Sequence, residues 1–216
     1  MTKRIAVLIS GQGRNLQAIL DACADRRIDG RVVAVISDRA DAAGLGKAAV
    51  AQVVPWAQSK NREEFCRSLA AALEVHRPDL VACAGFMRVL TPEFTRQFEE
   101  RLLNIHPSLL PRHRGLHTHR AALVAGDKDH GASVHFVTAE LDGGPLIIQG
   151  RIPVRSGDTE AALAERVMNE VELKIYPQVL AWLARGALCC NAGVIQFNGQ
   201  PLKQALTLDD LEPAFR

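Results

Sequence analysis

The stretch that decides the fold is RIAVLISGQGRNLQAIL, at residues 4–20. A run of apolar, mostly branched residues ends in a Gly-x-Gly turn at Gly11 and Gly13, and a helical pattern begins at Arg14. A strand, a tight turn and a helix in this order typically open an α/β fold. The glycines let the backbone approach a ligand, and the free amides at the start of the helix suit a phosphate.

This turn departs from the dinucleotide fingerprint. Leu16 stands where Gly-x-Gly-x-x-Gly has its third glycine, which favours a single phosphate over a dinucleotide. The side chains of Arg14 and Asn15 add hydrogen-bond donors for an anion. A plain tight turn without any ligand is the competing interpretation of the segment.

Strand and helix patterns alternate through the first hundred residues. The predicted strands cover residues 4–9, 31–36, 51–55, 80–84 and 102–105, and the predicted helices cover residues 14–25, 41–50 and 62–76, with another beginning at Thr91-Pro92. The strands are continuous apolar runs, as is typical of parallel strands buried on both faces. We predict an α/β fold with a mostly parallel, doubly wound, Rossmann-like sheet and helices on both faces.

The second half has a different texture and predicts an added antiparallel C-terminal part. Its expected elements are a loop at 107–120, a short helix at 120–125, strands at 133–138 and 145–153, a long helix at 158–183 and a hairpin at 187–202. The last dozen residues carry little pattern, and we expect partial disorder there. We predict one domain over residues 1–216, with a phosphate-binding half (1–100), a catalytic half (101–185) and a C-terminal hairpin and tail (186–216).

The net charge, the cysteines and the apolar runs of the sequence bear on its partners and its compartment. A formal net charge of +2 over 216 residues gives no broad basic surface, so we expect no nucleic-acid partner. The five cysteines form no CxxC pair, which favours reduced thiols in a cytoplasmic protein. No apolar run approaches the roughly 18 residues of a membrane span, and the run at 5–9 is too short for a signal peptide. We expect no membrane partner, and a monomer or weak homodimer.

The segment NIHPSLLP, at residues 104–111, carries the strongest functional signal. Asn104 and His106 lie two residues apart at the end of a predicted strand, so their side chains share one face, where open sheets bind ligands. An amide can donate to a developing oxyanion, and an imidazole can move a proton near neutral pH. Asp142, in a turn before Gly143, is a carboxylate placed to orient the ring. This combination is suited to acyl transfer.

Two alternatives stay open for these residues. One alternative is that His106 is solvated or has a purely structural role. The second alternative is a metal site, because His117 and His119 are spaced to chelate. No third ligand follows at a recognisable spacing, so we expect no metal. The remaining histidines in this half are His113, His130 and His135. The chain has no GxSxG motif, which favours direct transfer without a covalent enzyme intermediate.

Six segments together resemble the folate-dependent formyltransferase family, in its phosphoribosylglycinamide branch. They are SGQGRNLQAI (10–19), AGFMR (84–88), LLNIHPSLLP (102–111), GLHTH (115–119), HGASVHFV (130–137) and LDGGP (141–145). The resemblance covers about residues 4–185, in order and without large gaps. It implies formyl transfer from 10-formyltetrahydrofolate, a co-substrate, to the amine of N1-(5-phospho-D-ribosyl)glycinamide, in de novo purine biosynthesis.

The resemblance also implies roles for individual residues. Asn104, His106 and Asp142 form the catalytic trio, in which the first two stabilise the tetrahedral oxyanion and the third holds His106 and helps to move the amine proton. The implied substrate-binding residues are Gly11, Gly13, Arg14, Asn15, Pro107, Asn169 and Glu172. The implied folate-binding residues are Arg62, Met87, Arg88, Val89, Leu90, Asn104, Ala139, Glu140, Leu141 and Asp142.

The chain departs from the family pattern at two places. Arg14 stands where the family usually has Ser, which adds a cation beside the expected phosphate. Leu173 follows Glu172 where the family often has Glu-His, which weakens the assignment of the long helix to substrate binding.

Other functions compete with this one. A 10-formyltetrahydrofolate hydrolase would share the trio but use water as acceptor, and a methionyl-tRNA formyltransferase would need a basic RNA surface. Both resemble longer chains with an additional domain. A non-catalytic nucleotide-binding module is a rival from a different class, since fold alone does not fix function.

Overall fold

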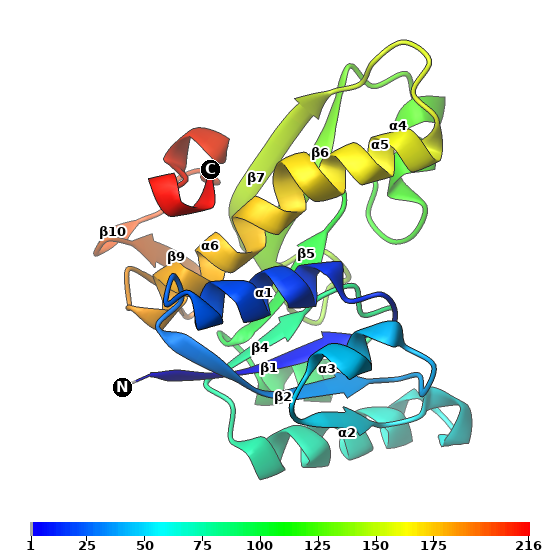
Figure 1. Cartoon of the computed structure of the whole chain (residues 1–216), viewed down its shortest axis with the longest axis vertical. Helices are drawn as coiled ribbons and strands as arrows, with labels where there is room; N and C mark the ends of the chain where they lie inside the picture. Colours follow the sequence, from blue (N-terminus) through cyan, green and yellow to red (C-terminus); the bar gives the residue numbers. More distant parts are fainter. Residues whose placement is uncertain (1) are drawn as a thin grey trace.

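A seven-stranded sheet forms the centre of the computed structural model, which describes residues 2–216 (Figure 1). Its strands are β1 (Lys3–Ile9), β2 (Gly30–Ser37), β3 (Ala51–Val53), β4 (Leu80–Cys83), β5 (Leu102–His106), β6 (Asp129–Phe136) and β7 (Leu146–Pro153). Their order is β3-β2-β1-β4-β5-β6-β7. All neighbours from β3 to β5 are parallel, whereas β5 to β7 are antiparallel. The predicted fold class is confirmed.

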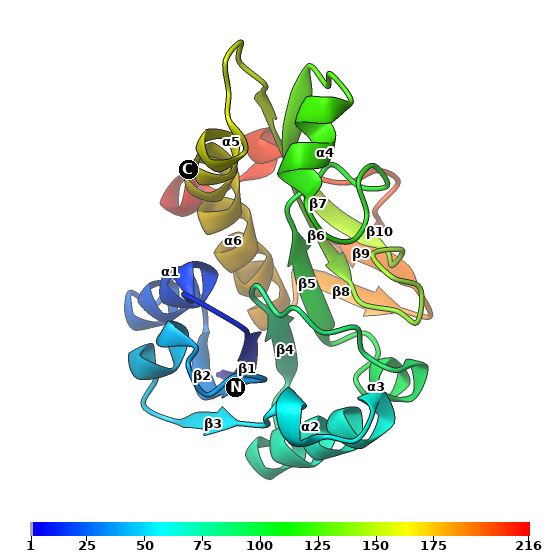
Figure 2. The same cartoon turned by 90° about the vertical axis from the view of Figure 1, so that its right-hand side faces the viewer.

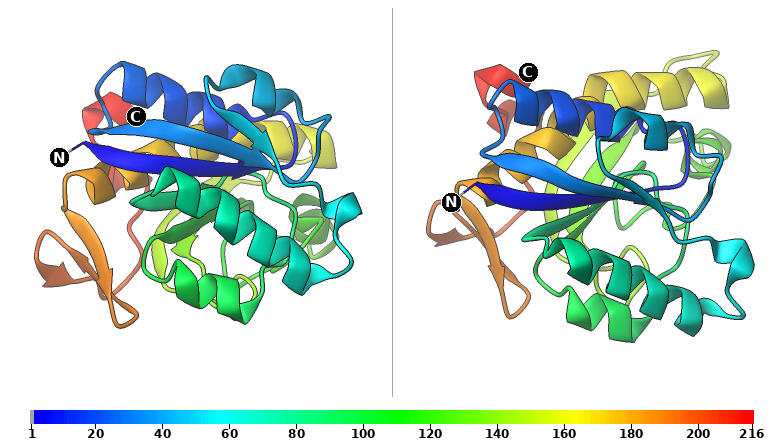
Figure 3. Two further views of the ribbon diagram at one scale, coloured as in Figure 1. Left: turned by 90° about the horizontal axis from the view of Figure 1, so that it is seen from below. Right: turned by 60° about the horizontal axis from the view of Figure 1, so that its bottom comes forward.

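Helices cover both faces of the sheet. They are α1 (Arg14–Ala24), α2 (Arg62–His76), α3 (Pro92–Gln97), α4 (Thr118–Val124), α5 (Glu160–Val167) and α6 (Leu173–Ala184). Figure 3 shows α1 and α6 on one face of the parallel strands, and α2 and α3 on the other. Figures 1 and 2 agree in placing α4 beside α5, at the end of the molecule away from α2. None of these helices in residues 2–216 has the length and apolarity needed to cross a membrane.

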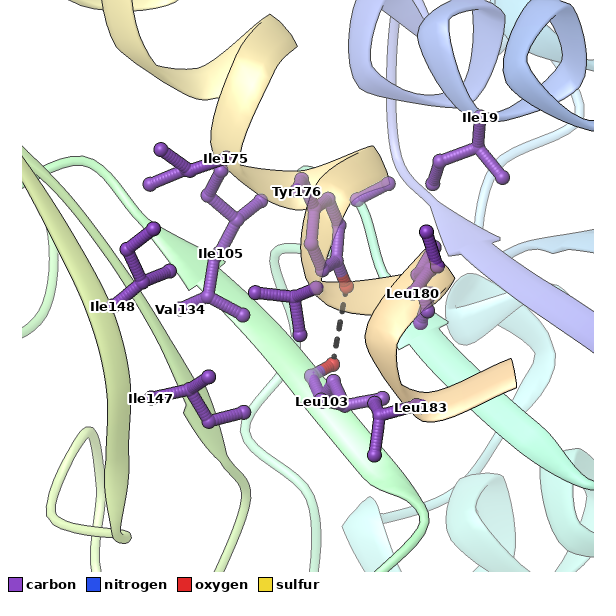
Figure 4. Close-up of a cluster of buried hydrophobic side chains, with 14 of the residues drawn as sticks. Ile19, Leu103, Ile105, Val134, Ile147, Ile148, Ile175, Tyr176, Leu180 and Leu183 are labelled. Carbon is purple, nitrogen blue, oxygen red and sulfur yellow. Dashed lines mark hydrogen bonds between the residues drawn. The ribbon is translucent and has the colours of Figure 1, made fainter. Parts of the chain in front are cut away.

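Strand β1 separates two hydrophobic cores, because successive side chains point to opposite faces. Val7 packs in the core formed with α1 and α6, while Leu8 packs in the core under α2. Figure 4 shows the larger core, where Tyr176 of α6 points its hydroxyl at β5. That hydroxyl donates to the carbonyl of Cys83 at 2.9 Å and lies 3.3 Å from the carbonyl of Leu103. The helix is thereby fixed over the two strands whose ends carry the site.

Two helix starts follow from capping residues that the sequence contains. The side chain of Asn61 accepts from the backbone N–H of Glu64 and caps α2, which spans the predicted residues. Thr91 accepts from the N–H of Phe94 and caps α3, with proline at the first helical position. Both arrangements satisfy backbone donors that a helix start leaves free.

The prediction of a helix over residues 41–50 is wrong. Only a short 3₁₀ helix forms there, at Ala43–Lys47. Its Gly44 donates a backbone hydrogen bond to the carbonyl of Gly11 at 3.0 Å, and a Cβ on Gly44 would lie 2.7 Å from Cδ1 of Ile9. This close approach to the Gly-x-Gly turn holds the segment, while two glycines within it weaken a regular helix.

The single helix predicted over residues 158–183 is interrupted. A π-helical turn at Met168–Glu172 separates α5 from α6. Pro177 lies inside α6, where it has no N–H for the carbonyl of Leu173 and its ring crowds that carbonyl. Wider turns of this kind commonly occur at functional sites, and this one carries the predicted site residues Asn169 and Glu172.

The C-terminal predictions need two corrections. The expected hairpin is a three-stranded antiparallel sheet of β8 (Leu188–Asn191), β9 (Val194–Phe197) and β10 (Gln200–Pro201). The final residues, for which we expected partial disorder, pack on the core through buried Leu211 and Phe215. Glu212 accepts from the indole N–H of Trp182 at 2.9 Å. These anchors are isolated apolar residues in a polar segment, so the sequence shows no periodicity there.

Candidate active site

A cavity of about 460 Å³ lies at the carboxyl ends of β4 and β5. Its walls come from the loop after β4, the end of β5, the start of α4 and the loop after β6. A smaller cavity of about 100 Å³ adjoins it and shares Asn104 and Asp142 with it. Both lie where open α/β sheets bind ligands, and the larger one has the size of a small-molecule site.

The structure brings the three predicted catalytic residues together. Asn104 and His106 project from β5, and Asp142 reaches them from the loop after β6. Oδ2 of Asp142 lies 3.6 Å from Nδ1 of His106, and both side chains are buried. The same carboxylate oxygen accepts a hydrogen bond from the backbone N–H of Gly115 at 2.9 Å. An amide, an imidazole and a carboxylate thus share one cavity wall.

The turn that presents Asp142 depends on a close backbone approach. Asp142 itself has φ of 49°, in the left-handed region. A Cβ on Gly144 would lie 1.9 Å from the carbonyl oxygen of Phe136, so only glycine fits between the turn and β6. The Asp-Gly-Gly sequence therefore folds the loop back sharply enough to direct the carboxylate at β5.

The protonation of His106 follows from its two neighbours. Its Nε2 lies 2.9 Å from the carbonyl oxygen of His113. Because a carbonyl oxygen only accepts hydrogen bonds, Nε2 carries a proton. Nδ1, the other ring nitrogen, faces Oδ2 of Asp142.

His135 is a further residue of the site, and its role was not among the sequence-based predictions. Strand pairing sets His135 opposite Asn104, and its Nε2 lies 3.3 Å from Nδ2 of Asn104. Its Nδ1 faces the carbonyl of Phe136 at 2.9 Å, so Nδ1 donates and Nε2 accepts from the amide. Burial lowers the pKa of His135, which keeps the ring neutral and able to accept. The pairing depends on the register between β5 and β6, for which the local sequence gives no signal.

The predicted phosphate-binding residues gather at the start of α1. Gly13 has φ of 69°, and a Cβ there would lie 2.9 Å from Cα of Gly44. Asn15 Nδ2 donates to Oε2 of Glu172 at 2.7 Å, and both residues are buried. Burial raises the pKa of Glu172, against the opposing effects of the Asn15 hydrogen bond and the Arg14 charge. The buried amide and carboxylate connect the glycine turn to the π-helical turn.

Arg14 extends this connection at the surface. Its guanidinium makes a two-pronged ion pair with Glu165, at 2.5 and 3.0 Å, and donates to Oδ1 of Asn169 at 2.7 Å. The pairing raises the pKa of Arg14 and lowers that of Glu165. The Arg14 cation therefore lies beside the glycine turn, already paired with a carboxylate.

The predicted folate-binding residues divide into two groups. One group lines the two cavities and consists of Met87, Arg88, Val89, Leu90, Asn104, Ala139, Glu140, Leu141 and Asp142; Pro107 lines the larger cavity with them. Arg88 is held by Asp38 at 2.5 Å and lies over the ring of Trp56. Arg62 lines neither cavity, and its nearest ionic partner is Glu63 at 3.8 Å.

The glycine turn lies next to the cavities without lining them. Gly11, Gly13, Arg14, Asn15, Asn169 and Glu172 are outside both linings. Ser10 connects the two regions, since its Oγ accepts from the N–H of Met87 at 2.9 Å. Across residues 2–216, no three His, Cys, Asp or Glu side chains converge as a metal site would require. His119 and His130 instead contact each other at 3.0 Å.

Comparison with known proteins identifies the family of the chain. The formyl transferase family model matches residues 3–180. The phosphoribosylglycinamide formyltransferase of Escherichia coli strain K12 is 49% identical over 202 residues, which cover 92% of this chain and 95% of the relative. Two solved structures are similar as well.

One is the phosphoribosylglycinamide formyltransferase of Coxiella burnetii in complex with CHES, with a TM-score of 0.89, 42% identity, and coverage of 96% of this chain and 99% of that one. The other is glycinamide ribonucleotide transformylase 1 of Symbiobacterium toebii, with a TM-score of 0.87, 46% identity, and coverage of 91% and 94%. The resemblance drawn from the sequence motifs is thereby confirmed, and the chain belongs to the formyl transferase family.

Proposed function

We propose that this chain transfers a formyl group from 10-formyltetrahydrofolate to the amine of N1-(5-phospho-D-ribosyl)glycinamide, in cytoplasmic purine biosynthesis. The observation that carries the proposal is the convergence of Asn104, His106 and Asp142 on the wall of one cavity. The names of the similar proteins support the glycinamide acceptor. We expect the enzyme to act as a monomer or weak homodimer without a metal.

The two regions of the site supply different substrates. The cavities between the loop after β4 and the loop at 139–142 bind the reduced folate. Its pterin ring is suited to a pocket with apolar walls and a few polar groups. The turn at Gly11 and Gly13 takes the phosphate on backbone amides at the start of α1. Asn15 adds a side chain to the phosphate site, and Glu172, to which it donates a hydrogen bond, contacts the ribose or glycinamide end of the acceptor.

The chemistry follows from the groups on the cavity wall. The amine nitrogen attacks the formyl carbon, and the formyl oxygen takes up the electron pair of its double bond. Asn104 Nδ2 has one N–H directed at His135 and a second free for this oxyanion, and Nδ1 of protonated His106 donates to it as well. Donors of this kind each contribute about 10²-fold or more to the rate.

Collapse of the intermediate breaks the bond between the formyl carbon and the folate nitrogen. That nitrogen needs a proton as it leaves, and the attacking amine has one to lose. Asp142, in the loop after β6, has its carboxylate 3.6 Å from His106. There it keeps the imidazole oriented and receives the amine proton through a water for delivery to the folate nitrogen. No covalent enzyme intermediate is required.

A 10-formyltetrahydrofolate hydrolase is the second candidate, since the same trio could activate water. The glycine turn with its buried Asn15–Glu172 pair favours a phosphorylated amine instead. The test is an absorbance assay of 10-formyltetrahydrofolate with and without glycinamide ribonucleotide. Turnover that requires the ribonucleotide supports the transferase, whereas equal turnover without it supports the hydrolase, and no turnover supports a binding module.

A further inference from the structure

His106 contacts the loop between β5 and α4 through the ring nitrogen that faces away from Asp142. The contact joins its Nε2 to the backbone carbonyl oxygen of His113 at 2.9 Å. This hydrogen bond decides which nitrogen keeps its proton and which one faces the reacting atoms. The position of one backbone carbonyl therefore controls the state of the proposed catalytic imidazole.

That carbonyl is held in place by the side chain of its own residue. His113 has φ of 51°, a left-handed conformation that a residue other than glycine keeps only when its surroundings hold it. Its imidazole Nε2 lies 2.7 Å from Oδ2 of Asp127, whose side chain is only 3% exposed. The guanidinium of Arg112 contacts the other oxygen of the same carboxylate. Two consecutive loop residues are thus tied to one buried group.

Asp127 is itself fixed by regular structure on both sides. It lies between the end of α4 and the start of β6. Its backbone N–H donates to the carbonyl of Ala122 in α4 at 3.1 Å. The carboxylate therefore has a defined position relative to β6, the strand that pairs with β5 and its His106.

We propose that Asp127 and His113 form a positioning pair for His106, acting through the His113 carbonyl. Neither residue lines the cavity that His106 faces, so neither touches substrate. In the neutral ring the pair keeps the proton on Nε2, so that Nδ1, which faces Asp142, is the nitrogen that takes up the second proton used in the proposed chemistry. This inference rests on the proposed role of His106 in formyl transfer.

Two substitutions of equal size and charge test the pair. Asp127→Asn removes the buried charge that His113 and Arg112 share. Asp129→Asn makes the same change two residues later, on a carboxylate 3.4 Å from Arg151 that is 41% exposed. We expect Asp127→Asn to lower kcat about 10-fold while KM for both substrates changes less than about 3-fold. Asp129→Asn should leave both constants within about 2-fold, and equal effects of the two variants would overturn the proposal.

A spectroscopic measurement separates positioning from general damage. Nitrogen-15 NMR of the histidine rings, with His106 assigned through its own substitution, reports which ring nitrogen carries the proton in the neutral form. We expect Nε2–H in the unaltered protein and a mixture of tautomers in Asp127→Asn and in His113→Phe. An unchanged His106 tautomer in both variants would overturn the proposal even if kcat falls.

A double variant then tests whether the effect passes through His106. In a His106→Asn background, Asp127→Asn should cause no further loss of kcat, because the positioned ring is already gone. Independent, multiplying losses would overturn the positioning role. Full activity of His106→Asn alone would instead remove His106 from the proposed chemistry, and the tautomer measurement would still decide whether the pair positions the ring.

Discussion

His130 should make the stability of this protein fall sharply in mild acid. The imidazole lies in β6 with only 1% of the residue exposed, and its Nε2 is 3.0 Å from Nδ1 of His119. Burial is the main cause that lowers the pKa of His130 from 6.5 to about 4, and the charges that nearby His119 and His113 can carry lower it further. In the folded state the ring therefore stays neutral at pH values where an unfolded chain would protonate it.

The sign and size of the effect follow from this difference. Between pH 6.5 and about 4, the unfolded chain binds a proton that the folded chain does not, so the free energy of unfolding falls as pH falls through this window. At about 1.4 kcal/mol for each pKa unit, the full shift corresponds to about 3 kcal/mol, of which about 2 kcal/mol is reached by pH 5. Above pH 7 the contribution is constant.

Urea denaturation at pH 7.5, 6, 5 and 4.5 measures the effect. His130→Gln keeps a neutral polar group near His119 and removes the titration, so its free energy of unfolding should depend less on pH than that of the unaltered protein. The difference in that dependence should reach about 2 kcal/mol at pH 5. His117→Gln, at an exposed residue, is the control and should follow the unaltered protein. Parallel curves for the unaltered protein and His130→Gln would refute the reasoning.

Three further predictions concern the site and its support. His106→Ala and Asp142→Asn should each lower kcat by about 10²-fold or more in steady-state assays, and a change confined to KM would contradict their roles. Arg14→Ser should raise KM for the phosphorylated substrate about 3-fold; an unchanged value would mean that the guanidinium stays on Glu165 when substrate binds. Tyr176→Phe should lower the free energy of unfolding by about 1–2 kcal/mol, because the buried carbonyls of Cys83 and Leu103 lose the hydroxyl that contacts them. An unchanged urea midpoint would argue against this hydrogen bond.

The fold could be predicted where local signals and tertiary packing agree. The apolar run of β1 and the Asn61 cap of α2 each specify their element within a few residues. The prediction failed at residues 41–50, where an alanine-rich pattern favoured a helix but Gly44 is held against Gly11 and Ile9. That contact joins residues more than thirty apart in the chain, and no local propensity reports it.

The site residues likewise divide into those that local spacing predicts and those that tertiary pairing places. Asn104 and His106 share a face because strand geometry repeats every two residues, so their convergence could be predicted from spacing alone. The contact of His135 with Asn104 depends on antiparallel pairing between β5 and β6. A shift of that register by one residue would turn the imidazole to the opposite face, and the sequence contains no turn that fixes the register directly.

The buried polar residues around the glycine turn give the clearest physical sign of function. Oδ1 of Asn15 has no hydrogen-bond partner among the described residues, and the buried carboxyl of Glu172 has a raised pKa. An unsatisfied amide oxygen and a desolvated carboxyl both lower stability, and apolar side chains would pack there at less cost. Buried polar groups that lower the stability of the fold are expected at positions where a ligand binds to them. The free amide oxygen of Asn15 and the carboxyl of Glu172 to which its Nδ2 donates are therefore the polar groups at the glycine turn that a bound substrate is expected to engage.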